Sequence, residues 1–314
     1  MITSESLRRD IARIIVWFPL RWLVIYFPWA NKEFFFFKLM GTFHYNLSKG
    51  LKKLLSENFN RAFNKSQPPK PFDNEIKKHL QNHYVSNMLI IMTPKFNKKN
   101  IHSYHSFENF EIIEENLKKG KGCILIHPHF GAVQLPFFHM AFTGQNIVQI
   151  GELIKPPDLS KIGEKVFQIR QDYENSLPQK IVSPRNFLRP VFQHLQNNGL
   201  VMMTGDGTGG GRFYGKFVTV DFLNNKMKFP IGAASLAEKT GSPLIPIFTV
   251  ADKDGRYKTI VEKPINIIEL EDKNKQIEES VKQFASVFER YVKQYPALWL
   301  LWDEFIPGLI LEKE

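Results

Sequence analysis

The chain has 314 residues, 43% of them hydrophobic, and a formal net charge of +11. This length is enough to bury a large core in one domain or two, and the single cysteine, Cys123, excludes an internal disulfide. The positive charge suits an anionic partner, whether nucleic acid, an anionic membrane or an acidic carrier protein. The 28 phenylalanines and an apolar N-terminus favour the membrane over nucleic acid.

An apolar and aromatic segment runs from Ile11 to Ala30. Arg13, Arg21 and two prolines interrupt it, so it falls short of the ~20 uncharged residues that a membrane span needs. No small-residue cleavage site of the kind found in signal peptides follows it. Its tryptophans, with basic residues upstream, suit a helix that lies in the membrane interface. The alternative is a first helix that packs on the rest of the domain.

The clear break in the chain is the proline-rich stretch at residues 67–71. Such a stretch is typical of a linker between structured regions. We therefore expect two parts: a helical, membrane-associating region over residues 1–71 and an α/β domain over residues 72–314.

Beyond the break, apolar residues recur with helix and strand periods. Two helices are expected first, at residues 80–94 and 107–119, before strands and helices alternate. The strands are expected at residues 124–126, 147–150, 180–182, 200–203, 244–249 and 257–261, the last at the edge of the sheet, and the later helices at 133–142, 159–170, 187–197, 231–240 and 274–294. This alternation predicts an α/β fold with a mainly parallel central sheet covered by helices.

The first of these strands ends in His127-Pro-His129-Phe-Gly131. Polar groups at the carboxyl end of a buried strand are where open α/β sheets place their chemistry, so His129 is the candidate general base. His127 lies on the same side of an extended chain, an arrangement that also suits a metal site. Only His139 follows as a further ligand within ten residues, nearly two turns into the next helix. A structural role, with both rings bonded to backbone carbonyls, is the other alternative.

A second strand, at residues 200–203, runs into a glycine-rich loop that contains Asp206. If the two strands are neighbours, this carboxylate lies beside His129; otherwise it is an ordinary turn aspartate. Arg185 and Arg189 stand at the start of the preceding helix. Arginines in that position can hold a phosphate or a carboxylate, although solvated surface positions are the usual case.

These motifs, in this order, resemble the bacterial lipid A biosynthesis acyltransferases, a family related to the phosphatidylinositol mannoside acyltransferases and the wider lysophospholipid acyltransferases. The family motif His-Phe-Gly-Asn-Trp-Glu matches this chain at His129, Phe130 and Gly131, but Gln134 stands where the family has glutamate or aspartate. Further resemblance lies at residues 217–222, 232–246 and 295–302, so it covers roughly residues 11–305.

The resemblance implies a membrane-associated acyltransferase that moves a fatty acyl chain from a thioester, on acyl carrier protein or coenzyme A, to a hydroxyl of a glycolipid or phospholipid. His129 is then the base, oriented by Gln134 or by Asp206 as a substitute carboxylate. The substrate-binding residues expected are His127, Gly131, Arg185 and Arg189. We expect no bound cofactor or metal, no nucleic-acid partner, and a peripheral or single-pass location at the cytoplasmic face of the inner membrane.

Two other functions stay open at this stage. The uncharged Gln134 also fits a relative that binds lipid without chemistry, since loss of a triad carboxylate can cost as much as ~10⁴ in rate. A metal-dependent hydrolase using His127 and His129 is the third possibility.

Overall fold

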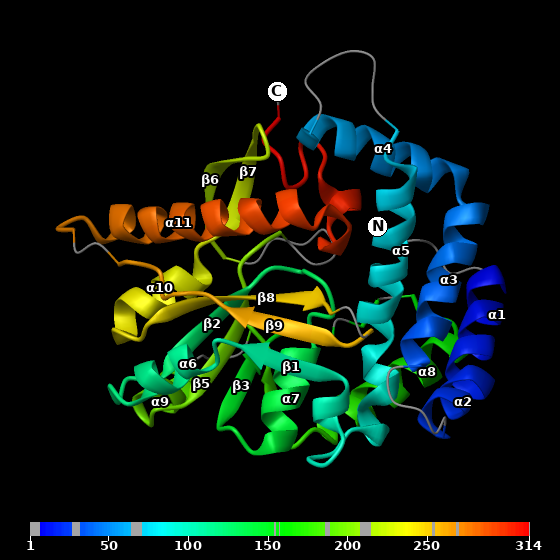
Figure 1. The fold of residues 1–314 in the computed structure, drawn as a ribbon, viewed down its shortest axis with the longest axis horizontal. Coiled ribbons are helices and arrows are strands. Elements are labelled where there is room, and N and C mark those ends of the chain that lie inside the picture. The colour runs from blue at the N-terminus through cyan, green and yellow to red at the C-terminus, as the bar shows by residue number, and fades with distance from the viewer. Residues whose placement is uncertain are drawn as a thin grey trace.

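A seven-stranded sheet forms the centre of the computed structural model, with helices on both of its faces (Figure 1). The structure describes residues 7–26, 32–63, 71–153, 155–156, 158–185, 189–207, 215–252, 255–267 and 270–313. In spatial order the strands are β1 (His105–Glu108), β9 (Tyr257–Val261), β8 (Leu244–Ala251), β2 (Cys123–His127), β5 (Leu200–Thr204), β3 (Ile147–Ile150) and β4 (Ile181–Val182). Within this sheet, β8 and β9 pair with each other in antiparallel fashion, and all other neighbouring strands are parallel. The expected mainly parallel α/β sheet is therefore confirmed.

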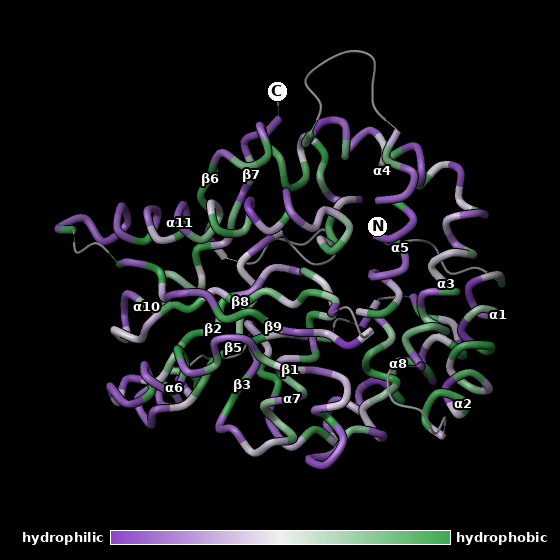
Figure 2. Tube along the Cα trace, in the orientation of Figure 1, coloured by the Kyte–Doolittle hydropathy of each residue, from purple (hydrophilic) through white to green (hydrophobic). Residues whose placement is uncertain are grey.

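The central strand β2 is buried at every position because both faces of the sheet are covered. Side chains alternate along a strand, so Ile124 and Ile126 enter one apolar core while Cys123 and Leu125 enter the other. Figure 2 shows the hydrophobic residues gathered along this central part of the sheet. The first core is covered by α9 (Arg189–Gln196), α10 (Gly232–Thr240) and α11 (Lys273–Gln294), and the second by α6 (Glu111–Leu117), α7 (Leu135–Thr143) and α8 (Lys161–Asn175).

The N-terminal part of the described chain is helical. Its helices are α1 (Leu7–Ile15), α2 (Arg21–Tyr26), α3 (Glu33–Leu47), α4 (Lys49–Phe63) and α5 (Asp73–Met88), with a π-helical stretch at Val16–Leu20. Helix α3 lies close against α5, since a Cβ on Gly41 would stand 2.6 Å from the Cα of Gln81. Residues 67–70 of the expected break lie outside the described residues, and the boundary between residues 71 and 72 stays a prediction.

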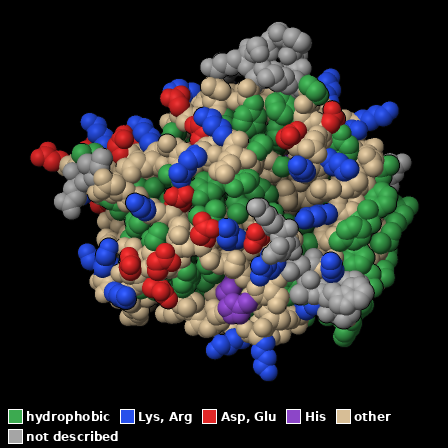
Figure 3. Space-filling model, viewed as in Figure 1, with side chains coloured by type: hydrophobic (Ala, Val, Ile, Leu, Met, Phe, Trp, Pro, Cys, Tyr) green, Lys and Arg blue, Asp and Glu red, His purple; other side chains and the backbone are tan. Residues whose placement is uncertain are grey.

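The apolar N-terminal segment has two faces. Trp17 and Val24 are buried in the second core, as expected for a helix packed on the domain. The opposite face is open, and every large hydrophobic side chain that is exposed in the described ranges lies between Leu7 and Leu47. These side chains gather at the right-hand edge of Figure 3, over α1, α2 and α3. No helix within the described ranges has both the length and the apolar character to cross a bilayer.

Most of the expected elements are found, with ends that shift by a few residues. The strands expected at residues 124–126, 147–150, 180–182, 200–203 and 244–249 are confirmed as β2, β3, β4, β5 and β8. The helices expected from residue 133 onward are confirmed as α7 to α11. The helix expected at residues 80–94 starts earlier, at Asp73, and its α-helical part ends at Met88; Pro94 falls in the 3-10 stretch that follows.

Two expectations near the edges of the fold are wrong, and one element was not expected. The helix expected at residues 107–119 is a strand and a shorter helix, because Phe107 pairs with Thr259 in β9 and Asn109 takes a left-handed φ of 62° that separates the two elements. For the same reason β9 is not at the sheet edge: β1 covers it. The hairpin of β6 (Phe217–Phe222) and β7 (Asn225–Pro230) was not expected; its turn uses positive φ at Leu223 and Asn224.

Candidate active site

The sheet brings His129 and Asp206 together because β2 and β5 are parallel neighbours, with His127 opposite Thr204. Each of the two residues lies just beyond the carboxyl end of its strand. The buried Asp206 accepts two hydrogen bonds at Oδ1, from the backbone N–H of His129 at 2.9 Å and from its Nδ1 at 2.8 Å. With Nδ1–H donating to the carboxylate, the Nε2 atom of His129 is left unprotonated, as a general base requires.

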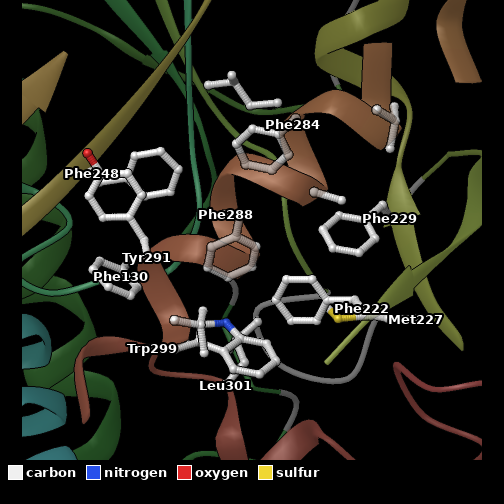
Figure 4. Packing of buried hydrophobic residues seen from close by; sticks show 14 of the residues in the cluster. Phe130, Phe222, Met227, Phe229, Phe248, Phe284, Phe288, Tyr291, Trp299 and Leu301 are labelled. Carbon is white, nitrogen blue, oxygen red and sulfur yellow. The ribbon is translucent and has the colours of Figure 1, made fainter. Parts of the chain in front are cut away.

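Trp299 completes this arrangement from the far end of the chain. Its indole Nε1–H donates to the second oxygen of Asp206, Oδ2, at 2.9 Å. Asp206 therefore receives three hydrogen bonds, and these fix the orientation of its carboxylate. Figure 4 shows the Trp299 ring beside Phe222 and Phe288 in a cluster of buried hydrophobic residues.

Backbone contacts hold the His129 loop against the segment around Trp299. The N–H of Leu300 donates to the carbonyl of His129 at 2.8 Å, and the N–H of Gly131 donates to the carbonyl of Leu298 at 2.8 Å. Gly131 has a φ of +65°, and a Cβ there would lie 2.1 Å from the carbonyl oxygen of Thr249. Only glycine fits this position, so its role is to let the loop pass close to β8.

The charge around His129 favours the imidazolium. Burial by itself lowers the pKa of this ring, but the charge and hydrogen bond of Asp206, and the charge of Glu304, act in the opposite direction. The net effect raises the pKa of His129 above its ordinary value of 6.5. The imidazolium form of His129 is therefore stabilised by the carboxylates of Asp206 and Glu304.

A cleft of about 400 Å³ opens in front of His129. Its wall also includes Gln134, Asp303 and Glu304, together with Arg170 and Glu174 from α8. A quarter of the His129 side-chain surface is exposed (25%), so the ring is accessible from the cleft while Asp206 behind it is not. A substrate in the cleft can thus reach the imidazole but not its carboxylate partner.

Gln134 lines the cleft, but Asp206 rather than Gln134 holds the Nδ1 atom of His129. The Gln134 Oε1 atom is buried and has no hydrogen-bond partner among the described residues. The carboxylate that contacts the Nδ1 atom of His129 is therefore that of Asp206, which lies just beyond the end of β5.

The other sequence-predicted residues lie away from the cleft wall. His127 is buried, its Nδ1 atom lies 3.1 Å from the carbonyl of Pro128, and its Nε2 atom has no partner in the described part of the chain. Arg185 forms an ion pair with Glu152, and Arg189 is exposed at the start of α9. Neither arginine lines the cleft, so their proposed contact with substrate stays a prediction.

His139, the further ligand considered for a metal, faces another part of the fold. Its Nδ1 atom lies 3.0 Å from that of His105, whose Nε2 atom is bonded to Thr259. Across the described ranges, no group of three or more histidine, cysteine, aspartate or glutamate side chains is arranged to hold a metal ion.

Sequence reasoning missed Trp299 and the carboxylates of Asp303 and Glu304 as site residues. The signal available was weak: an aromatic stretch followed by two acidic residues near the C-terminus. Nothing in that pattern shows that it folds back onto a histidine more than 160 residues earlier in the chain.

The sequence is similar to those of known proteins. Phosphatidylinositol mannoside acyltransferase of Mycobacterium tuberculosis, from strain CDC 1551 / Oshkosh and from strain ATCC 25618 / H37Rv, is 29% identical to this chain over 140 residues. That alignment covers 43% of this chain and 40% of the relative, so the chain spans less than half of the relative's length. Residues 5–303, nearly the whole chain, match the family of bacterial lipid A biosynthesis acyltransferases. The chain belongs to that family.

Proposed function

We propose that this protein is an acyltransferase that moves a fatty acyl chain from a thioester to a hydroxyl of a glycolipid or phospholipid, with His129 as the general base. The observation that carries the proposal is the His129–Asp206 pair at the wall of an open cleft. Family membership supports acyl transfer, and the mycobacterial relative, named for acylating a phosphatidylinositol mannoside, supports a glycolipid acceptor.

In the proposed reaction the Nε2 atom of His129 takes the proton of the acceptor hydroxyl. The acceptor oxygen then attacks the thioester carbonyl, the new C–O bond forms, and the C–S bond breaks. The thiolate leaves and takes the proton back from the imidazolium. Asp206 keeps the ring in the required tautomer and balances its charge, so the uncharged Gln134 does not leave the imidazolium without a counter-charge.

The experiment that tests this proposal is thioester turnover. Detergent-purified protein is supplied with labelled acyl carrier protein or acyl coenzyme A and a total lipid extract, and His129→Ala is run beside it. An acylated lipid that appears only with the unchanged protein, detected by mass spectrometry, supports the transferase. Retention of lipid by both proteins without turnover would favour a non-catalytic lipid-binding relative instead.

The rate of transfer is expected to rise with pH and to level off above the raised pKa of His129, because only the neutral ring can accept a proton. Asp206→Asn removes the carboxylate that raises this pKa. The midpoint of the pH–rate curve is therefore expected to move to lower pH, and the maximal rate at high pH is expected to be much lower. The measurement is kcat/KM between pH 5 and 9 for both proteins. An unchanged midpoint in the variant would contradict the assignment of Asp206.

The N-terminal helices are proposed to lie on an anionic membrane surface. Two observations support this proposal: the exposed apolar face between Leu7 and Leu47, and the net charge of +11. Binding to vesicles that contain anionic lipid is expected to weaken about tenfold in Ile15→Ser/Leu23→Ser, which removes two exposed apolar side chains of this face. Lys226→Ser, on the hairpin strand β7, is the control. Equal binding by both variants in a sedimentation assay would argue against this surface.

The positive charge of the protein also supports a proposal for the acyl donor and for the location of the protein. An acyl thioester on acyl carrier protein or coenzyme A is anionic, and a basic protein surface attracts either carrier. A peripheral position on the cytoplasmic face of the inner membrane gives the protein access to both the soluble donor and the lipid acceptor.

A further inference from the structure

The segment that carries Trp299 has little regular structure of its own. It consists of two short 3-10 turns, Pro296–Leu298 and Trp302–Glu304, with Trp299 between them. The indole of Trp299 donates to Asp206, so the place of this segment decides where that donor lies. Turns of three residues make few hydrogen bonds of their own, and their carbonyl groups need partners from elsewhere in the fold.

Helix α4 holds the second of these turns. The Nδ2 atom of Asn58 donates to the carbonyl of Trp302 at 2.6 Å, and both residues are buried. Arg61, one helical turn later, donates from Nη1 to the carbonyl of Phe305 at 3.0 Å and also to the Oδ1 atom of Asn58. The ring of Phe59 stacks on that of Trp302, with 4.2 Å between the centroids. Helix α4 thus binds the turn through both polar and apolar contacts.

Helix α5 holds the first turn in the same way. The Nδ2 atom of Asn82 donates to the carbonyl of Ala297 at 3.1 Å. His79 lies on the same face of the helix, three positions earlier. Burial lowers the pKa of His79 to about 3, while a hydrogen bond with the backbone of Trp299 acts in the opposite direction. Figure 1 shows the C-terminal segment, in red, beside α4 and α5.

The segment therefore lies between the two helices and the catalytic pair. Neither Asn58 nor Asn82 lines the cleft, so neither is placed to touch a substrate there. Their hydrogen bonds act on the two turns that flank Trp299, whose own bond to Asp206 is 2.9 Å long. A shift of the segment would lengthen that bond and release one oxygen of the carboxylate. Since a misplacement of about 1 Å can cost about 10²-fold in rate, these two amides can control catalysis from a distance.

Resting on the proposed acyl transfer, we propose that Asn58 and Asn82 are positioning residues for the reaction. By holding the two turns they keep Trp299 on Asp206, and so keep the carboxylate in place beside His129. Helices α4 and α5 are then part of the catalytic apparatus, although α4 belongs to the region that the sequence predicts as a separate membrane-associating part. Loss of either amide lowers kcat and leaves KM for the thioester unchanged, because the wall of the cleft stays the same.

The first measurement needs no activity. The chain has five tryptophans, so isotope-labelled full-length protein gives five indole N–H signals in a magnetic resonance spectrum, and Trp299→Phe identifies the signal of Trp299. A buried N–H that donates to a carboxylate exchanges slowly with water. In Asn58→Ala this exchange is expected to become about tenfold faster, and the signal is expected to move toward the position that it has in Asp206→Asn.

The second measurement is acyl transfer, with kcat and KM for the thioester determined separately. Asn58→Ala is expected to lower kcat about tenfold and Asn82→Ala about threefold, at unchanged KM. Asn116→Ala is the matched control, because Asn116 is also buried but donates to the carbonyl of Ile112 within its own helix, α6. This control is expected to leave both kcat and the Trp299 signal unchanged.

Variants of Asn82 test the inference even if Asn58→Ala does not fold, since the Asn82 side chain is only partly buried. Asn82→Asp keeps the size of the side chain but, when ionised, has no N–H to donate. It is therefore expected to behave like Asn82→Ala, with lower kcat and faster exchange at Trp299. An unchanged Trp299 signal in the folded variants, or a change confined to KM, would overturn the inference.

Failure of the proposed function gives a different result. If exchange at Trp299 responds to Asn58 and Asn82 but no thioester is consumed by the unchanged protein, the acyl transfer is wrong while the positioning contact stands. If thioester is consumed and the variants match the unchanged protein in kcat, the transferase stands and the positioning role is wrong.

Discussion

Replacing His129 by alanine is expected to lower the rate of acyl transfer by about 10²–10⁴, the usual contribution of a general base. Asp206→Asn is expected to cost a similar factor, because both oxygens of Asp206 accept hydrogen bonds, from His129 and from Trp299. An asparagine has a single acceptor oxygen, so its NH₂ group would face one of these donors. The His129 ring would then lose either the hydrogen bond at Nδ1 or the tautomer that leaves Nε2 unprotonated.

The comparison that decides the role of the carboxylate is Asp206→Asn against Gln134→Ala. Gln134 lines the same cleft as His129, but Asp206 is the residue that is hydrogen-bonded to the His129 Nδ1 atom. Gln134→Ala is therefore expected to be far less damaging in single-turnover assays with acyl thioester. A larger loss in Gln134→Ala than in Asp206→Asn would mean that Gln134, in spite of its missing charge, orients the base.

Trp299→Ala is expected to lower the free energy of unfolding by about 3–5 kcal/mol, as for other large side chains removed from a core. Trp299 is fully buried and packs against Phe222, Phe288, Trp302 and Phe305. The truncation also removes the donor to Asp206, so a buried carboxylate loses one of its partners. Urea unfolding followed by circular dichroism measures the change.

Two further variants separate packing from hydrogen bonding at this position. Trp299→Phe keeps most of the apolar volume but not the N–H, and is expected to cost about 1.5–3 kcal/mol, the range for a hydrogen bond to a charged group, with reduced activity. Trp22→Ala, at a half-exposed tryptophan of α2, is expected to change stability by less than about 1 kcal/mol. Equal losses in Trp22→Ala and Trp299→Ala would show that Trp299 does not hold the core.

The sheet was largely predictable because its signals are local. Each of β2, β3, β5 and β8 is a short apolar run next to glycine, proline or polar residues, and such a run predicts a strand without knowledge of its neighbours. The edge of the sheet was not predictable in this way. Phe107 fits an amphipathic helix by its spacing to Phe110 and Ile113, and only its pairing with Thr259 makes it part of a strand.

By itself the sequence determined the α/β class, His129 as the candidate base and the family resemblance, because these depend on periodicity and on motifs within a few residues. Only the tertiary structure decided that Asp206 binds His129, across 77 positions of sequence, and that Trp299 binds Asp206 across 93. Strand order, which places β5 next to β2, creates the first contact, and the return of the C-terminal segment creates the second. Both follow from the burial of apolar faces over the whole chain, a global property that no local pattern of residues contains.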